Sequence, residues 1–142
     1  MNRILKELSE GVSEYYHDLV NNQKLLLTLD LFMAKGKLSM DMGGEEPEIN
    51  EDGIMDLKSA RHPLIAADKV VPIDISIGGE YRTLVITGPN TGGKTVTLKT
   101  ARLLSLMSQT GLHIPAAIGS RLPVYHQIFA DIGDEQSIEQ SL

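Results

Sequence analysis

Residues 81–95 read YRTLVITGPNTGGKT, and this stretch decides the fold. Tyr81–Thr87 consists mostly of β-forming residues and is typical of a buried strand. Gly88–Thr95 matches the pattern G-x-x-x-x-G-K-[ST] at every fixed position, which indicates a loop that holds nucleotide phosphates. The apolar spacing that follows predicts a helix over Val96–Gln109, with Gly111 near its C-terminal cap. We therefore expect a strand, a phosphate loop and a helix in succession.

Such a loop can bind ATP and Mg²⁺ through groups of three kinds. Its glycines let backbone N–H groups approach phosphate oxygens, and the helix N-terminus adds positive electrostatic character. Lys94 is expected to reach the β- and γ-phosphates, and the hydroxyl of Thr95 to complete the Mg²⁺ shell. The residues expected to contact the nucleotide here are Gly88, Pro89, Asn90, Thr91, Gly92, Gly93, Lys94, Thr95 and Val96.

The first 41 residues contain no proline, and eleven positions in them follow one another at alternating intervals of three and four. Nine of these positions are apolar, namely Leu5, Leu8, Val12, Tyr15, Leu19, Leu26, Leu29, Met33 and Met40, and the other two are Asn22 and Gly36. The pattern favours a long continuous helix over a helical hairpin, packing along a partner and without chemistry of its own. Gly11, Gly36 and the polar residues 21–23 are the places where we would expect a break.

An acidic, breaker-rich stretch at 43–48 marks the expected domain boundary. It separates a lever-like helical segment, 1–42, from an α/β domain, 43–142. Besides the strand at 81–87, short β-rich runs at Ile54–Leu57 and Val70–Ile77 predict strands in the second part.

Composition narrows the class of protein. The chain has no cysteine, which excludes disulfides and thiol sites, and no apolar run approaches the roughly 20 residues that cross a membrane, so we expect a cytoplasmic protein. The net charge of −6 indicates that these residues alone bind DNA or RNA poorly, although residues 61–130 carry 7 basic and 3 acidic side chains. The four histidines lack metal-ligand spacing, which argues against zinc, and His62 is either structural or near the nucleotide.

Two segments, LVITGPNTGGKTVTLKT at 84–100 and LLSLMSQTGLHIPA at 103–116, carry a resemblance to a known family. Together they resemble the ATPase domain of the mismatch-repair MutS family. ARHPLI at 60–65, VVPIDI at 70–75 and IFADIGDEQSIEQSL at 128–142 resemble the MutS-II branch, whose members act on DNA and usually carry a C-terminal Smr nuclease domain. The resemblance implies a P-loop NTPase fold related to ABC and MutS ATPases, an ATPase parent with an endonuclease domain elsewhere, and a homodimer.

The resemblance also carries residues over by position. Val70 and Val71 lie where the family packs side chains against adenine, although relatives often have an aromatic residue at the first position. Ile73 stands where relatives often have asparagine. Gln136 falls in the loop that approaches the γ-phosphate in related ATPases, or is simply solvated.

The family would continue after Leu142 into a Ser-Thr-Phe signature, a strand ending in Asp-Glu and a switch histidine. Asp131, Asp134 and Glu135 do not match that Asp-Glu pair, so we expect these 142 residues to bind nucleotide and hydrolyse it very slowly or not at all. Three alternatives remain open: a non-hydrolysing nucleotide sensor, an unrelated phosphate-loop enzyme such as a kinase, or a parent that acts on ribosomal RNA instead of DNA.

Overall fold

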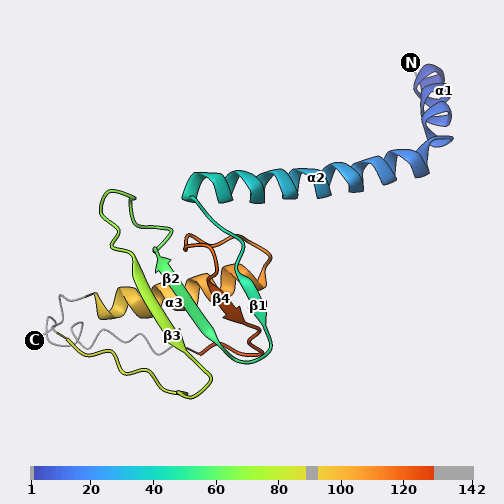
Figure 1. Ribbon diagram of the computed structural model, residues 1–142. Helices are drawn as coiled ribbons and strands as arrows, with labels where there is room; N and C mark the ends of the chain where they lie inside the picture. The colour runs from blue at the N-terminus through green and yellow to red at the C-terminus, as the bar shows by residue number, and fades with distance from the viewer. Residues whose placement is uncertain (1, 89–92, 130–142) are drawn as a thin grey trace, which may run out of the picture. The chain divides into compact units, whose positions relative to one another are not determined.

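The computed structural model describes residues 2–88 and 93–129 (Figure 1). The chain divides into two compact units, Met1–Leu38 and Ser39–Leu142. The first unit contains α1 (Asn2–Ser13) and most of α2 (Tyr16–Met42). The described part of the second unit is a mixed α/β arrangement of a four-stranded sheet and one helix.

The helical prediction for the N-terminal segment is confirmed, but the expected continuity is wrong. The helix breaks at Glu14 and Tyr15, and neither glycine interrupts it. At the break the Ser13 hydroxyl donates to Glu10 O at 2.8 Å, while Tyr15 N donates to Val12 O at 3.1 Å. These two bonds accompany the end of α1 at Ser13.

Within the first unit, most of the large apolar side chains of both helices are exposed. On α1 the apolar and charged side chains lie on different faces. Leu5 and Leu8 share one face, and the ion pairs Arg3–Glu7 and Lys6–Glu10 lie on the other side. On α2 apolar and polar side chains are distributed around the helix, so it has no single apolar stripe. In the described part of the chain, no helix combines the length and apolar character needed to cross a membrane.

The sheet of the second unit has the strand order β1-β4-β2-β3. β1 (Glu48–Asn50) runs parallel to β4 (Arg121–Pro123), and β2 (Met55–Ala60) pairs antiparallel with both β4 and β3 (Ile73–Ile77). The predicted strands at 54–57 and 70–77 are confirmed, with the second one beginning after Pro72 because proline cannot donate to a ladder. The sequence pattern missed β1 and β4, since three residues are too few to show alternation.

A short turn joins β1 to β2, and the side chain of Asn50 closes it. Asn50 Nδ2 donates to Ile54 O at 2.8 Å, and Ile54 N donates back to Asn50 Oδ1 at 3.1 Å. Gly53 occupies the left-handed region within this turn, with φ of 73°. These two hydrogen bonds join the last residue of β1 to the residue before β2 and so close the turn between the two strands.

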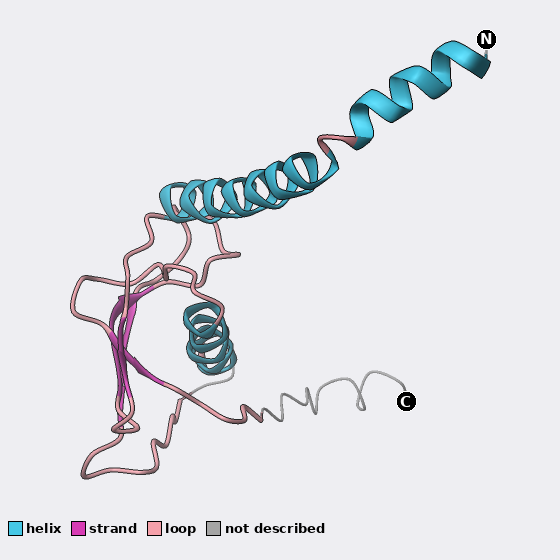
Figure 2. Cartoon of the chain, turned by 90° about the vertical axis from the view of Figure 1, so that its right-hand side faces the viewer, coloured by secondary structure: helices cyan, strands magenta, loops and turns pink. Residues whose placement is uncertain are grey.

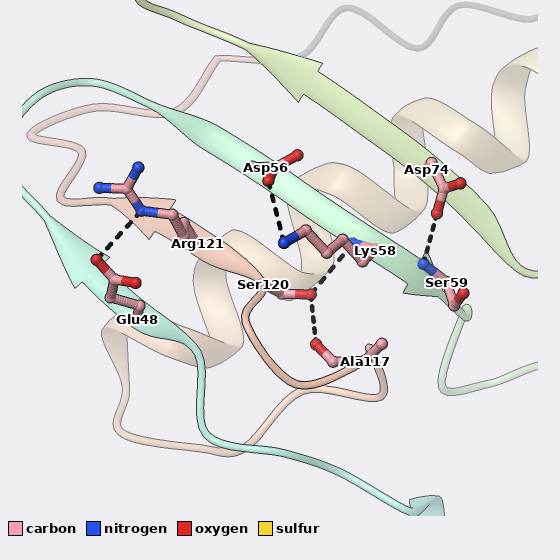
Figure 3. Close-up of polar contacts among 8 residues, drawn as sticks. All are labelled: Glu48, Asp56, Lys58, Ser59, Asp74, Ala117, Ser120 and Arg121. Atoms are coloured by element: carbon pink, nitrogen blue, oxygen red, sulfur yellow. Dashed lines mark hydrogen bonds and ion pairs between the residues drawn. The ribbon is translucent and has the colours of Figure 1, made fainter.

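Polar contacts fix β4 against both of its neighbours (Figure 3). Arg121 Nε donates to Glu48 Oε1 across the β1–β4 pair at 3.2 Å. Ser120 Oγ accepts from Lys58 N at 3.1 Å and donates to Ala117 O at 2.7 Å. Ser120 is buried, so these bonds satisfy a hydroxyl that would otherwise be costly inside the protein.

The helix α3 (Lys94–Gln109) lies along one face of the sheet (Figure 2). Leu104 is fully buried on its inner side, and it shares the core with Leu57 from β2, Ile75 from β3 and Leu122 from β4. Smaller polar side chains of the same helical face are also buried, namely Thr100, Ser105 and Ser108. The prediction of this helix is confirmed, although it begins two residues earlier than expected. Packing of this face holds the start of α3 beside the sheet.

The strand predicted over Tyr81–Thr87 is wrong, because these residues form a loop. Val85 is 75% exposed and Leu84 is 46% exposed, so the run is not buried. In the described part of the chain, this run contributes to one isolated β-bridge, which joins Tyr81 to Gly78. β-forming residues become a strand only where a neighbouring strand completes the hydrogen-bond ladder.

Candidate functional site

The described ends of the glycine-rich loop are joined by Lys94. Gly88 and Gly93 both have positive φ, 146° and 77°, and Gly93 is the N-cap of α3. From the first position of the helix, Lys94 Nζ donates to Gly88 O at 2.6 Å. The lysine therefore reaches back from the start of α3 to Gly88, the first residue of the glycine-rich pattern.

The helix N-terminus supplies backbone donors beside that lysine. The first backbone bond of α3 runs from Thr97 N to Gly93 O at 2.9 Å. The N–H groups of Thr95 and Val96 precede this bond, so helix geometry gives them no acceptor within the helix. Together with the helix dipole, such N–H groups favour an anion.

A cavity of about 370 Å³ adjoins this helix start. Its volume falls within the roughly 300–1,000 Å³ that is usual for small-molecule sites. The described residues that line it come from the turn after β2, from the segment before β3 and the first residue of β3, and from the N-cap and first two turns of α3. They are His62, Ile65, Lys69, Val70, Val71, Ile73, Gly93, Val96, Thr97 and Thr100.

The polar groups of the cavity are cationic or neutral. Among its described lining residues there is no aspartate or glutamate, and Lys69 adds a positive charge. The hydroxyls of Thr97 and Thr100 donate to Gly93 O at 3.1 Å and Val96 O at 2.7 Å. His62 Nδ1 accepts from Leu64 N at 3.3 Å. The cavity therefore suits a ligand with an apolar part and a negative part.

These features fit a nucleotide with its metal ion. Aliphatic side chains can cover a base, while the N-terminus of α3 and Lys94 can face phosphates. Within residues 2–88 and 93–129, no three His, Asp or Glu side chains gather into a metal-binding group. A Mg²⁺ ion would therefore depend on phosphate oxygens, water and the exposed Thr95 hydroxyl, as this ion commonly does.

Comparison with known proteins places this site in a family context. Residues 84–142 match the family model described as MutS domain V. The chain is 59% identical over 140 residues to "Endonuclease MutS2" of Alkaliphilus metalliredigens, an alignment that covers 99% of the chain and 18% of that protein. The protein of the same name from Clostridioides difficile gives the same figures, and the "Putative endonuclease MutS2" of Bacillus subtilis is 54% identical with the same coverage.

The chain is similar to proteins named MutS2. It spans about 18% of the length of these relatives and resembles them over nearly all of its own length. The match to MutS domain V begins at Leu84, four residues before the glycine-rich loop, and includes all of α3. The resemblance to the MutS family inferred from the motifs is thus supported.

Several residues singled out in the sequence lie around one cavity. Val70 and Val71, assigned to the adenine by resemblance, line the same space as Gly93 and Val96 from the loop and helix. Thr95 is exposed on the first turn of α3. Other predicted positions lie outside the described residues, namely Pro89, Asn90, Thr91, Gly92, Asp131, Asp134, Glu135 and Gln136.

Sequence reasoning missed four lining residues, Ile65, Lys69, Thr97 and Thr100. For the two threonines a local signal existed, because Gly93, Val96, Thr97 and Thr100 share one helical face at i, i+3, i+4 and i+7. For Ile65 and Lys69 no such signal is present, since only the folded sheet brings them to α3.

Proposed function

We propose that this chain binds ATP with Mg²⁺, as part of a P-loop ATPase domain of the MutS-II type. The observation that carries the proposal is the cavity beside the N-terminus of α3, where Val70 and Val71 meet Gly93 and Val96. In this proposal the loop from Gly88 to Thr95 and Val96 hold the phosphates and the two valines cover the adenine. Residues 1–42 form a lever-like helical segment and 43–142 the N-terminal portion of the ATPase domain.

Titration calorimetry with ATP and ADP, with and without Mg²⁺, tests the nucleotide and metal assignments. Thr95→Ala removes the hydroxyl proposed for Mg²⁺, so it should weaken Mg–ATP binding and leave metal-free ATP binding nearly unchanged. Thr95→Ser keeps the hydroxyl and serves as the matched control. Equal losses with and without Mg²⁺ would contradict the metal role.

We further propose that the 142-residue polypeptide does not turn over ATP at an ordinary enzymatic rate. Phosphoryl transfer to water needs a carboxylate to hold Mg²⁺ and a group to orient the attacking water. None of the described residues that line the cavity is acidic. A steady-state phosphate-release assay should show turnover far below about 1 s⁻¹, the lower end of typical enzymes. Turnover in the ordinary range would contradict this. The same observation favours nucleotide sensing as the alternative role.

For the whole protein, we propose a homodimeric ATPase in which the nucleotide state moves a DNA-binding clamp through the lever-like segment. The relatives are named endonucleases, and the nuclease would belong to the part of those proteins that this chain does not span. Ribosomal RNA is the alternative target. Because the net charge is −6, these residues alone should bind labelled DNA or RNA weakly in fluorescence anisotropy. A Kd below about 10⁻⁷ M at physiological salt would contradict the proposal that other parts of the whole protein bind the nucleic acid.

A further inference from the structure

His62 lies at the edge of the cavity proposed for the nucleotide and contributes to its lining. It follows β2 and begins a turn in which Ile65 N donates to His62 O at 3.1 Å. Arg61, the preceding residue, is also anchored, because its backbone N donates to Pro115 O at 2.8 Å. The backbone of His62 is therefore held on both sides, and its ring has a defined place beside the cavity.

The hydrogen bond to Nδ1 determines which ring nitrogen can donate. Leu64 N donates to His62 Nδ1 at 3.3 Å, so this nitrogen acts as an acceptor and carries no proton in the neutral ring. The proton of the neutral ring is then on Nε2. The turn thus converts the imidazole into a single N–H donor of fixed tautomer.

The rest of the lining leaves a role for such a donor. Five of the other described lining residues are aliphatic, Ile65, Val70, Val71, Ile73 and Val96, and these can give a base only apolar contact. The two threonine hydroxyls already donate to carbonyls of their own helix. Lys69 carries a compact positive charge, which is better suited to binding a phosphate than to binding a neutral nitrogen of a base. Within the described lining, His62 is the one aromatic ring and the neutral donor best suited to a base.

We propose that His62 contacts the nucleobase, donating a hydrogen bond from Nε2 to a ring nitrogen or carbonyl oxygen of the base. The proposal rests on the proposed nucleotide function of the loop and adds the residue that makes the site prefer a nucleotide to a bare polyphosphate. Apolar cover alone would not orient the base, whereas one directed hydrogen bond fixes its rotation in the cavity.

The test compares Mg–ATP with Mg–tripolyphosphate by titration calorimetry on the wild type, His62→Phe and His62→Gln. Phenylalanine keeps a ring of similar size without the donor, and glutamine keeps an N–H donor at a similar reach. We expect His62→Phe to bind ATP about fivefold more weakly, which is the size of one net hydrogen bond, and to bind tripolyphosphate as the wild type does. His62→Gln should bind ATP within about twofold of the wild type.

His126→Phe is the matched control, because His126 is exposed and does not belong to the cavity lining. It should change the affinity for neither ligand. Unchanged ATP affinity in His62→Phe, or an equal loss for both ligands, would overturn the base contact while leaving the phosphate loop in place. If neither ligand binds the wild type, the proposed function fails and the base contact fails with it. Should His62→Phe not fold, His62→Ala compared with His62→Gln gives the same decision.

Discussion

Replacing Gly93 by alanine tests the backbone conformation on which the loop depends. Gly93 has φ of 77° at the N-cap of α3, and a Cβ built there meets no atom of the described residues within 4 Å. The cost of the substitution is therefore backbone strain without steric overlap. A left-handed conformation costs an L-residue roughly 1–2 kcal/mol, so Gly93→Ala should lower the free energy of unfolding by that amount.

Gly53 offers a matched control within the same unit. It has nearly the same φ, 73°, and equally open space for a Cβ, but it lies in the turn between β1 and β2. Urea denaturation should show a similar loss of roughly 1–2 kcal/mol for Gly53→Ala. The two variants should differ in calorimetry with ATP, because only Gly93→Ala alters the phosphate loop. ATP affinity should fall for Gly93→Ala and stay at the wild-type value for Gly53→Ala.

Two results would refute this reasoning. If Gly93→Ala unfolds at the same urea concentration as the wild type, the left-handed conformation is not required at that position. If both variants lose ATP affinity to the same extent, the loss reflects general destabilisation and not the geometry of the loop.

Three further predictions concern the sheet and its covering helix. Leu104→Ala should lower the free energy of unfolding by about 2–5 kcal/mol in urea, because the side chain is fully buried between α3 and the sheet; a loss below about 1 kcal/mol would contradict that packing. Asn50→Ala should cost about 1–3 kcal/mol in the same assay, since it removes both hydrogen bonds that close the β1–β2 turn, and an unchanged midpoint would show that the turn forms without them. Burial raises the pKa of Tyr125 above its usual 10.0, so the stability that the neutral phenol contributes should be intact below pH 10 and lost as pH rises through the folded-state pKa. In ultraviolet titrations of the folded protein, Tyr125→Phe should lack a tyrosine that titrates above pH 10 in the wild type; if the tyrosine that disappears titrates near pH 10, the prediction is contradicted.

The part of the fold that the sequence predicts best is encoded locally. α3 follows from the apolar spacing within Val96–Gln109, although the helix begins two residues earlier than this spacing predicts, at Lys94. The run Tyr81–Thr87 shows the limit of this reasoning, because its residues fit a strand but a strand also needs a partner. Similarly, the break after Ser13 falls at none of the positions where the sequence suggested one, and the apolar spacing runs through it without interruption.

The candidate site likewise contains residues that the sequence predicts and residues that it does not. The phosphate-loop residues and the two valines could be named from motifs and resemblance, although they are more than 15 positions apart in the chain. The two valines line one cavity with Gly93, Val96, Ile65 and Lys69 because β3 and the turn after β2 pack beside α3. Periodicity within one element carries no information about such contacts between elements.

Calorimetric titration of Mg–ATP into the wild type, Lys94→Ala and Lys99→Ala tests the central claim most directly. Lys99 is an exposed lysine on the same helix, so its variant controls for the loss of one positive charge. The account predicts that Lys94→Ala weakens binding by about tenfold or more, the size of a hydrogen bond between charged groups, whereas Lys99→Ala binds as the wild type does. Equal affinity of the wild type and Lys94→Ala would contradict it.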